Sequence, residues 1–486
     1  MKRLNRWDCV GIGALGVFVA CLYLLTENPA VSDDSLARAL SPNSTQPQVG
    51  HEWLGIYLNE RKVGFFHLEK TLNEIGLAYA VEGRIEQKGI LGEPLTLELD
   101  VRAQLDGEMA LNRVTFKIEA GPAQFLGRAV VVGRTLKLAI DTGGETREES
   151  IPLEGPLVLR ETLGPRLALL DLSPGATREV RLFDPITQRQ QTARIEVIGH
   201  EQVVVVDRLV DAIRIVQDVN GMRLNAWLNR RGEVMRQELG FGLVAVRETE
   251  LQARRQSEPV SLVERTMIDV PDLKKTQIEG PRIAFDLGGA DLTGFELNVG
   301  RQNFADGRLT VTKETAFTGK PLSTKHADDE FLQPSLLIQS DAQPIIDAAR
   351  QAIGGATDTL TAAKRLMHWV SDTVADVAVI GVPSALETLK AKQGDCNEHT
   401  TLFVAMARAI GIPTRFVTGL AYLKGRFAYH AWAEVQVESG WLSVDPTWAQ
   451  LPADVGHLAF VRGGLGQQAG LLRLMGNLTI EHVSRP

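Results

Sequence analysis

The segment from Gly394 to Thr400 reads GDCNEHT, and it decides the fold of the C-terminal part of this 486-residue chain. Apolar residues follow Cys396 at helical spacing as far as Ala409, and Gly411 ends the pattern. Asp395 stands just before the pattern, where an aspartate suits a helix N-cap. We therefore expect Cys396 in the first turn of a helix, where free backbone N–H groups and the helix dipole favour a thiolate and can hold an oxyanion.

A buried structural cysteine is the alternative for Cys396, because free cysteines are often buried. Polar residues on both sides of this thiol argue against that alternative. Two of the three cysteines, Cys9 and Cys21, lie in an N-terminal apolar segment, so the remainder of the chain has one thiol and no internal disulfide. In an exported protein, a nucleophile is the best explanation for a lone thiol.

A strand pattern carries His430. Polar and apolar residues alternate from His430 to Val437, which predicts a strand with one buried face. Gly440 marks a turn, and Trp441 to Asp445 is predicted to be the second strand of a hairpin. Two adjacent antiparallel strands can bring His430 and Asp445 within hydrogen-bond reach. Cys396, His430 and Asp445, 34 and then 15 positions apart, therefore suit a thiol nucleophile, its base and the carboxylate that orients the base.

These segments resemble the transglutaminase-like superfamily, which has a papain-like cysteine fold. The resemblance runs from near Ser340 to near Phe460, and four segments carry it: Gly394–Glu398, Ala409–Arg415, His430–Trp432 and Asp445–Trp448. It implies that Cys396 is the nucleophile, His430 the base and Asp445 the orienting residue. It also implies acyl transfer from an amide, through a thioester, to water or an amine. Animal transglutaminases carry Gln-Cys-Trp at the nucleophile, whereas this chain has Asp395-Cys396-Asn397, which favours the bacterial members and puts protein crosslinking in doubt.

Four further residues are weaker site candidates, for an oxyanion donor or a substrate contact: Gln393, Glu398, Trp432 and Trp448. Gln393 is an oxyanion donor only by analogy with papain-like enzymes, at a different spacing. Glu398 could orient a loop or hold a substrate amine, and the two tryptophans could line an acyl channel or pack in the core. His399 is an alternative base, three positions after the cysteine on the same helix, but a remote carboxylate orients such a residue less readily.

The composition is that of an ordinary globular protein, with 44% hydrophobic and 23% charged residues. The net charge of −8 gives no basic balance, so nucleic acid is not an expected partner. No loop has the acidic spacing of an EF-hand, and we expect neither a metal nor another cofactor.

The N-terminus carries Lys2, Arg3 and Arg6 ahead of an apolar run at residues 9–25. Residues 1–32 are predicted to be a signal anchor or signal peptide, and the polar residues 33–50 a linker. Because the positive residues precede the apolar run, the positive-inside rule places the bulk of the chain outside the cytoplasm. We expect a single-pass protein of the inner (cytoplasmic) membrane with periplasmic domains. A secreted protein, or a lipoprotein lipidated at Cys21, is the alternative.

The fold class predicted for the whole chain is α+β. Short alternating apolar runs at residues 51–251 predict an antiparallel β domain, either an open or half-closed barrel or a sandwich, with a short helix near 157–172. Residues 252–335 are predicted to be a connector with a small β insert, including strand-like runs at 294–299 and 308–311. Residues 336–462 are predicted to be the transglutaminase-like domain, and residues 463–486 a C-terminal tail.

The first functional hypothesis is an extracytoplasmic enzyme that attacks amide bonds of a peptide or protein through a Cys396 thioester. Hydrolysis by a peptidase or amidase is favoured over transamidation, because nothing in the sequence excludes water. The second hypothesis is a catalytically silent scaffold that binds peptides, although a scaffold does not need an intact Cys-His-Asp set. The third is an envelope-polymer or lipid-binding protein whose β domain holds an apolar chain.

Overall fold

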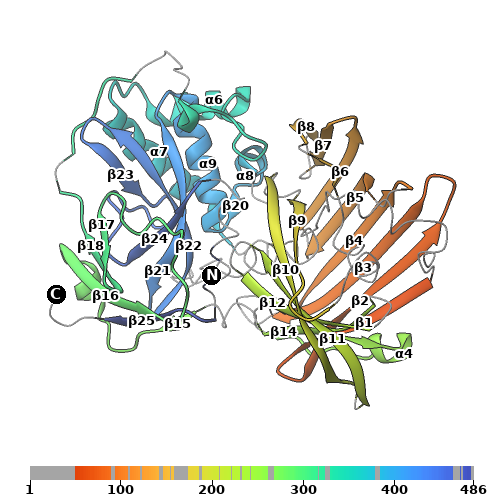
Figure 1. Ribbon diagram of the computed structural model, residues 1–486. Helices are drawn as coiled ribbons and strands as arrows, with labels where there is room; N and C mark the ends of the chain where they lie inside the picture. Colours follow the sequence, from red (N-terminus) through yellow and green to blue (C-terminus); the bar gives the residue numbers. More distant parts are fainter. Residues whose placement is uncertain are drawn as a thin grey trace. The chain divides into compact units, whose positions relative to one another are not determined.

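The computed structural model describes two compact units of the chain (Figure 1). The β unit lies within residues 18–261, and the C-terminal unit lies within residues 262–486. The described residues are 50–88, 94–107, 110–120, 123–141, 146–153, 155–157, 173–184, 189–206, 208–219, 222–229, 233–240, 242–260, 267–315, 317–322, 329–377, 384–463, 471, 474 and 476–482.

Three predictions fall outside these residues or nearly so. The apolar run at 9–25, almost all of the linker at 33–50 and nearly all of the predicted helix at 157–172 are not described. Within the described part of the chain, no helix has both the length and the apolar character needed to cross a membrane.

The β unit contains one antiparallel sheet of fourteen strands among its described residues. The strands are β1 (Gly50–Leu58), β2 (Arg61–Leu72), β3 (Leu77–Lys88), β4 (Pro94–Leu105), β5 (Leu111–Ala120), β6 (Ala123–Val132), β7 (Thr135–Asp141), β8 (Thr146–Pro152), β9 (Thr177–Asp184), β10 (Arg189–Val205), β11 (Arg208–Val219), β12 (Met222–Leu228), β13 (Val234–Gly240) and β14 (Leu243–Glu248). The short helix α4 (Glu250–Ala253) follows them.

Neighbouring strands of this sheet are also neighbours in sequence, except where β1 pairs with β14. Two meanders, β1–β8 and β9–β14, are therefore joined through the first and last strands, and the sheet order ends at β8 on one side and β9 on the other. Alternate residues of β3 are buried, as expected for strands with one face against a core. The predicted antiparallel β domain is confirmed, and a single sheet excludes the sandwich for the described strands.

A five-stranded sheet and four helices form the centre of the C-terminal unit (Figure 1). The sheet order is β15 (Ile268–Asp269), β22 (Arg426–Val437), β21 (Thr414–Leu423) and β24 (His457–Arg462), with β23 (Gly440–Val444) also paired to β22. The helices are α6 (Gln343–Ile353), α7 (Thr359–Thr373), α8 (Ala385–Ala391) and α9 (Cys396–Ala409). Helix α9 packs against β21 and β22, and the other three helices pack against α9. Two short strands, β19 (Ala375–Asp376) and β20 (Gln393–Gly394), run in parallel just before α9.

Strand β22 differs from its prediction because both of its faces are buried. Every residue from His430 to Val435 is buried, although polar and apolar residues alternate there. Helix α9 packs against this strand, and the Trp448 ring from the loop after β23 stacks on His430. On the polar face, Trp448 covers His430, while Arg415 and Arg462 pair with Glu434. The prediction of one buried face is therefore wrong.

The small β insert belongs to the C-terminal unit. Strands β16 (Arg282–Gly288), β17 (Gln302–Ala305) and β18 (Arg308–Thr312) form a four-stranded sheet with β25 (Thr479–His482), which the C-terminal tail supplies. The strand predicted at 308–311 is confirmed by β18, whereas residues 294–299 form irregular structure and bends rather than a strand. The helical turns α5 (Lys275–Ile278) and η3 (Glu330–Leu332) complete this unit.

Candidate active site

A capping box fixes the start of helix α9 at Cys396. The Asp395 carboxylate accepts a hydrogen bond from the Asn397 N–H at 2.8 Å, and Glu398 Oε2 accepts one from the Asp395 N–H at 2.9 Å. Gly394 permits this arrangement, because a Cβ at that position would lie 2.3 Å from Glu398 Cβ. The prediction that Asp395 is the N-cap and that Cys396 opens the helix is confirmed.

The helix start is tied to the strand that carries His430. Thr400 lies one helical turn after Cys396, on the same face of α9, and its hydroxyl donates to the Ala431 carbonyl at 3.1 Å. The Cys396 thiol itself makes a hydrogen bond with the backbone of Ala431. The sulfur therefore lies beside the residue that follows His430 on β22.

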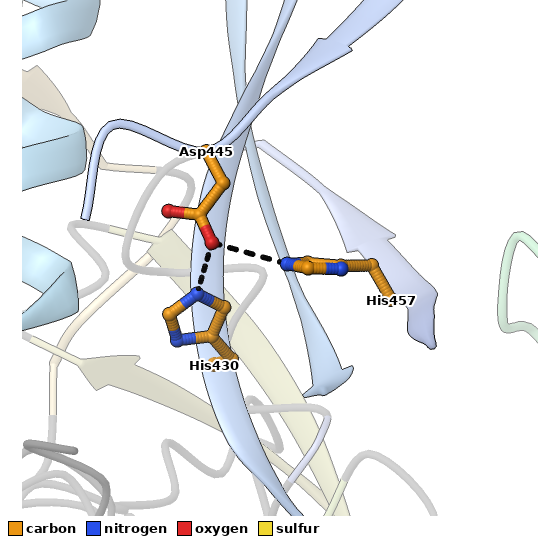
Figure 2. A group of neighbouring side chains, drawn as sticks. All are labelled: His430, Asp445 and His457. Carbon is orange, nitrogen blue, oxygen red and sulfur yellow. Dashed lines mark hydrogen bonds and ion pairs between the residues drawn. The ribbon is translucent and has the colours of Figure 1, made fainter. Parts of the chain in front are cut away.

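His430 and Asp445 form a buried pair (Figure 2). His430 Nε2 lies 2.9 Å from Asp445 Oδ2, and the two side chains are 1% and 0% exposed. Asp445 Oδ1 accepts two further hydrogen bonds, from the N–H groups of Thr447 at 2.8 Å and Trp448 at 3.1 Å. Burial alone would raise the pKa of Asp445, but the histidines beside it outweigh burial and hold this pKa below its usual range.

The other ring nitrogen of His430 is left available for a proton. Nδ1 is buried and has no hydrogen-bond partner among the described residues. With Nε2–H donating to Asp445, the tautomer that fits this contact leaves a lone pair on Nδ1. The Trp448 ring stacks on the imidazole, with 4.3 Å between ring centroids and an interplanar angle of 15°, and fixes its plane. His430 is thus oriented as a base by Asp445 and Trp448.

A second histidine, His457, binds the same carboxylate oxygen (Figure 2). Its Nε2 lies 3.1 Å from Asp445 Oδ2 and its Nδ1 lies 2.9 Å from Asp454 Oδ1. Burial lowers the pKa of His457, but the two carboxylates outweigh burial and raise this pKa to about 9. His457 is therefore an imidazolium at neutral pH, and its charge helps keep Asp445 ionised. The sequence analysis missed this residue, which reaches the site because β24 pairs with β21.

The same three side chains are close enough together to be considered as metal ligands. The possible ligand atoms of His430, Asp445 and His457 all lie within 4.8 Å of one another. However, both Nε2 atoms point at one carboxylate oxygen, and Nδ1 of His457 faces a second carboxylate, that of Asp454 (Figure 2). These distances of 2.9–3.1 Å are those of hydrogen bonds, so the residues fit a hydrogen-bonded group better than a metal centre.

The ionisation expected for Cys396 is wrong for this structure. The thiol is 1% exposed, and burial, followed by the nearby Asp395 carboxyl, raises the pKa of Cys396 well above its usual value. The hydrogen bond with Ala431 acts in the opposite direction but is outweighed. Burial overcomes the effect of the helix start, so Cys396 is a neutral thiol here and needs a base to become a nucleophile.

His399 is not arranged as that base. Its Nδ1 lies 2.7 Å from the Asp395 carbonyl and its Nε2 lies 3.2 Å from the Val374 carbonyl. Burial lowers the pKa of His399. Both ring nitrogens are thus held by the backbone, and His399 links helix α9 to the end of α7.

The structure places the four weaker site candidates in different environments. Glu398 is engaged in the capping box, so it orients the loop and does not hold a substrate amine. Trp432 is 1% exposed and packs in a cluster with Val417 and Ala459, which makes it a core residue. Gln393 is exposed on β20, and its side chain makes no hydrogen bond among the described residues, so nothing favours it as an oxyanion donor. Both tryptophans stack on His430: the ring centroids are 6.1 Å apart for Trp432 and 4.3 Å apart for Trp448, which makes the closer contact.

Asp376 is a second residue that the sequence analysis missed. It lies on β19 and pairs with Gly394 of β20. Gly394 stands two positions before Cys396 in the sequence. Its Oδ1 is buried and has no hydrogen-bond partner in the described part of the chain. Burial, followed by the charge of Asp445, raises the pKa of Asp376 to about 7.

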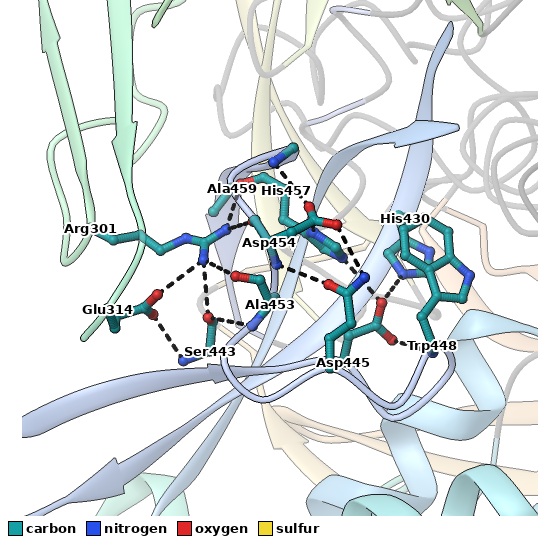
Figure 3. Close-up of polar contacts among 12 residues, drawn as sticks. Arg301, Glu314, His430, Ser443, Asp445, Trp448, Ala453, Asp454, His457 and Ala459 are labelled. Carbon is teal, nitrogen blue, oxygen red and sulfur yellow. Dashed lines mark hydrogen bonds and ion pairs between the residues drawn. The ribbon is translucent and has the colours of Figure 1, made fainter. Parts of the chain in front are cut away.

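Arg301 ties the small β insert to the loop that carries the site (Figure 3). Its guanidinium donates to the carbonyls of Ala453 and Asp454, and at 3.3 Å to that of His457. It also forms an ion pair with Glu314 at 3.0 Å, and its side chain is 6% exposed. The insert therefore stabilises the position of the segment that contains Asp454 and His457.

One family model matches the C-terminal unit. Residues 346–446 match the family model described as the transglutaminase-like superfamily. No curated protein matches the chain.

Three solved structures share distant similarity with the chain. A "Putative Cysteine Protease" from Cytophaga hutchinsonii is 19% identical, with a TM-score of 0.27, and the match covers 41% of this chain and 83% of that one. A β-barrel-like protein of a domain of unknown function from Brucella abortus is 11% identical, with a TM-score of 0.33 and coverage of 41% and 96%. A "Putative Protease" from Parabacteroides distasonis is 8% identical, with a TM-score of 0.18 and coverage of 69% of each chain.

Proposed function

We propose that this chain, whose residues 346–446 belong to the transglutaminase-like superfamily, is a cysteine-dependent acyl-transfer enzyme. Its substrates would be amide bonds of a peptide or protein. One observation carries the proposal: His430 is held by Asp445 through Nε2, while its buried Nδ1 is unpartnered beside the strand position that binds the Cys396 thiol. This is the arrangement that a neutral thiol needs in order to lose its proton at the moment of attack.

In the first half-reaction, His430 Nδ1 takes the proton of Cys396 and the sulfur attacks the amide carbonyl carbon. The N–H of Cys396, at the first helical position, has no acceptor within the helix and can donate to the resulting oxyanion. The C–N bond then breaks, His430 gives its proton to the leaving nitrogen, and a thioester remains on Cys396. Asp445 stabilises the imidazolium that exists between these two proton transfers.

In the second half-reaction, His430 takes a proton from water and the hydroxide oxygen attacks the thioester. The C–S bond breaks, a carboxylic acid leaves, and the proton returns to Cys396. An amine in place of water would give a new amide, which is the transamidase outcome. Hydrolysis is favoured, because the Gln-Cys-Trp sequence of the crosslinking enzymes is replaced by Asp395-Cys396-Asn397.

The reaction is tested with the full chain and a peptide library in water enriched in ¹⁸O. Hydrolysis incorporates one ¹⁸O atom at each new carboxyl terminus, whereas added hydroxylamine, as the competing amine, gives hydroxamates from the same thioester. Both products are expected to disappear in Cys396→Ala. Products that persist in that variant would overturn the proposal.

A catalytically silent scaffold is the competing function. The raised pKa and burial of Cys396 favour this alternative, because a closed, neutral thiol is unreactive by itself. The oriented His430–Asp445 pair opposes it, because a scaffold needs no base. For the lipid-binding alternative there is little support: the cavity of about 890 Å³ in the β unit is lined largely by charged side chains, including Glu82, Arg84, Glu98 and Lys117.

We place the enzyme outside the cytoplasm, anchored by residues 9–25, on the charge pattern of the N-terminus alone. The expected result is that carbonate washing leaves the full chain in the membrane fraction. In intact spheroplasts, an external protease should degrade it. Protection from that protease would contradict the proposed location.

A further inference from the structure

A cavity lies next to the tryptophan that covers the catalytic histidine. It has a volume of about 710 Å³ and lies entirely within the C-terminal unit. Its walls come from helix α5, the turn between β21 and β22, and the loop that follows β23. A space of this size can hold several residues of an extended peptide or a small ligand.

Trp448 connects this cavity to the reaction centre. One face of its indole stacks on the His430 ring, and the ring of His457 meets the indole at 71°. Trp448 is half-buried and also lines the cavity, together with Tyr422. Aromatic walls of this kind suit the apolar part of a bound chain, and they place it one ring away from the base.

The charge of the cavity is positive. Three lysines line it, Lys275, Lys313 and Lys424, against two carboxylates, Glu279 and Asp454. Both carboxylates are already engaged by cations, because Glu279 pairs with Lys275 at 3.4 Å and Asp454 pairs with His457 at 2.9 Å.

Among these lysines, Lys313 has no ion-pair partner in the described part of the chain. It follows β18 of the insert, whereas Lys424 projects from the turn between β21 and β22. The two ammonium groups therefore come from separate elements that both border the cavity. An anionic group that enters the cavity would meet a net positive charge.

We propose that this cavity is the subsite for an acidic segment of the substrate, so that the enzyme prefers amide bonds flanked by Asp or Glu side chains. The inference rests on the proposed function and adds a substrate class to it. The carboxylates of the substrate would approach Lys313 and Lys424, while its backbone lies along Trp448 and leads to the thiol. Each exposed charge pair of this kind changes affinity by a factor of about two to five, so loss of both lysines should raise KM by roughly tenfold.

The test compares two peptide libraries of equal length, one with Glu and one with Gln at the positions that flank a randomised centre. The full chain should cleave the Glu library with a KM about tenfold lower than that of the Gln library, with similar kcat. This preference should disappear in Lys313→Gln/Lys424→Gln. A matched control is Lys364→Gln/Lys390→Gln, which removes the same charge from exposed positions of α7 and α8 outside the cavity and should keep the preference.

The outcomes separate this inference from the proposed function. Cleavage of both libraries with equal KM, or a preference that survives in the Lys313/Lys424 variant, would overturn the subsite while leaving the enzyme intact. If neither library is cleaved, the proposed function fails, and binding to the Cys396→Ala chain decides the subsite. Tighter binding of a Glu-rich peptide than of its Gln analogue, lost with the two lysines, would uphold it; equal binding would overturn it.

Discussion

His457 donates a hydrogen bond to Asp445 Oδ2 at 3.1 Å, on the same oxygen that accepts from His430 at 2.9 Å. The Asp445 carboxylate thus lies between two histidines: His430, which is the base in the proposed reaction, and His457, which carries a positive charge. His457 touches neither thiol nor substrate in this arrangement, so it is a positioning residue. Asp454 holds the other ring nitrogen of His457 at 2.9 Å, and the imidazolium of His457 helps keep Asp445 in place and ionised.

The first prediction concerns His457→Gln. Loss of a hydrogen bond to a charged group of this kind should slow the alkylation of Cys396 by roughly ten- to a hundredfold. Because native His457 loses its charge as the pH rises through its pKa of about 9, the difference in rate between the two proteins should shrink above that pH. A purely structural role would lower the rate by the same factor at every pH, and that result would contradict the positioning role.

The same residue predicts how stability depends on pH. The pKa of His457 is raised above its unfolded value of 6.5 to about 9, so its contribution is complete below pH 6.5 and is lost as the pH rises through about 9. Its size is roughly 3 kcal/mol. In thermal unfolding, the difference in Tm between the native chain and His457→Gln should therefore be large at pH 6 and much smaller at pH 10. An equal difference in Tm at both pH values would show that the histidine is not charged in the folded state.

Arg301→Gln should destabilise the C-terminal unit by roughly 3 kcal/mol. The substitution leaves Glu314 and several loop carbonyls without their buried cationic partner. Alkylation of Cys396 should slow as well, because the loop with His457 loses its support. Arg308→Gln is the matched control: Arg308 pairs with Asp286 on the surface, and its loss should change neither quantity measurably. Equal effects of the two variants would rule out a special role for Arg301.

Asp376→Asn should stabilise the protein at neutral and alkaline pH. Because burial raises the pKa of Asp376 to about 7, ionisation of this carboxyl opposes folding progressively between about pH 4 and 7, and fully above 7. The variant should gain about 1–2 kcal/mol at pH 8 after allowance for solvent screening, and nothing at pH 4. The exposed Asp272→Asn serves as control. An equal gain in stability at pH 8 and at pH 4 would contradict a buried carboxyl with a raised pKa.

The sequence predicted the three residues at the centre of the site because each stands at a local signal. Cys396 follows an N-cap, His430 lies on β22, and Asp445 directly follows β23, which pairs with β22 across the turn before Gly440. Those signals depend on neighbours within a few residues, so they survive without knowledge of the tertiary fold. The β unit was predicted for the same reason, since the alternation along β3 is local.

The residues that were missed depend on contacts between distant segments. His457 reaches Asp445 only because β24 pairs with β21, and Arg301 reaches the same loop from the insert. The ionisation of Cys396 was predicted wrongly, because a helix start is visible in the sequence while the burial that outweighs it is not. Burial likewise decided that Trp432 is a core residue, whereas Trp448 remains at the site.

The central claim is that His430 activates Cys396, and the most direct test is the rate of alkylation of Cys396 by iodoacetamide between pH 5 and 10. The rate is read by mass spectrometry of the peptide that contains Cys396, in the full native chain and in His430→Ala. We predict that the native thiol reacts at neutral pH, well below the ordinary thiol pKa of about 8.5, and that the histidine variant loses this reaction. Equal rates in both proteins, rising only at high pH, would contradict the account and favour the silent scaffold.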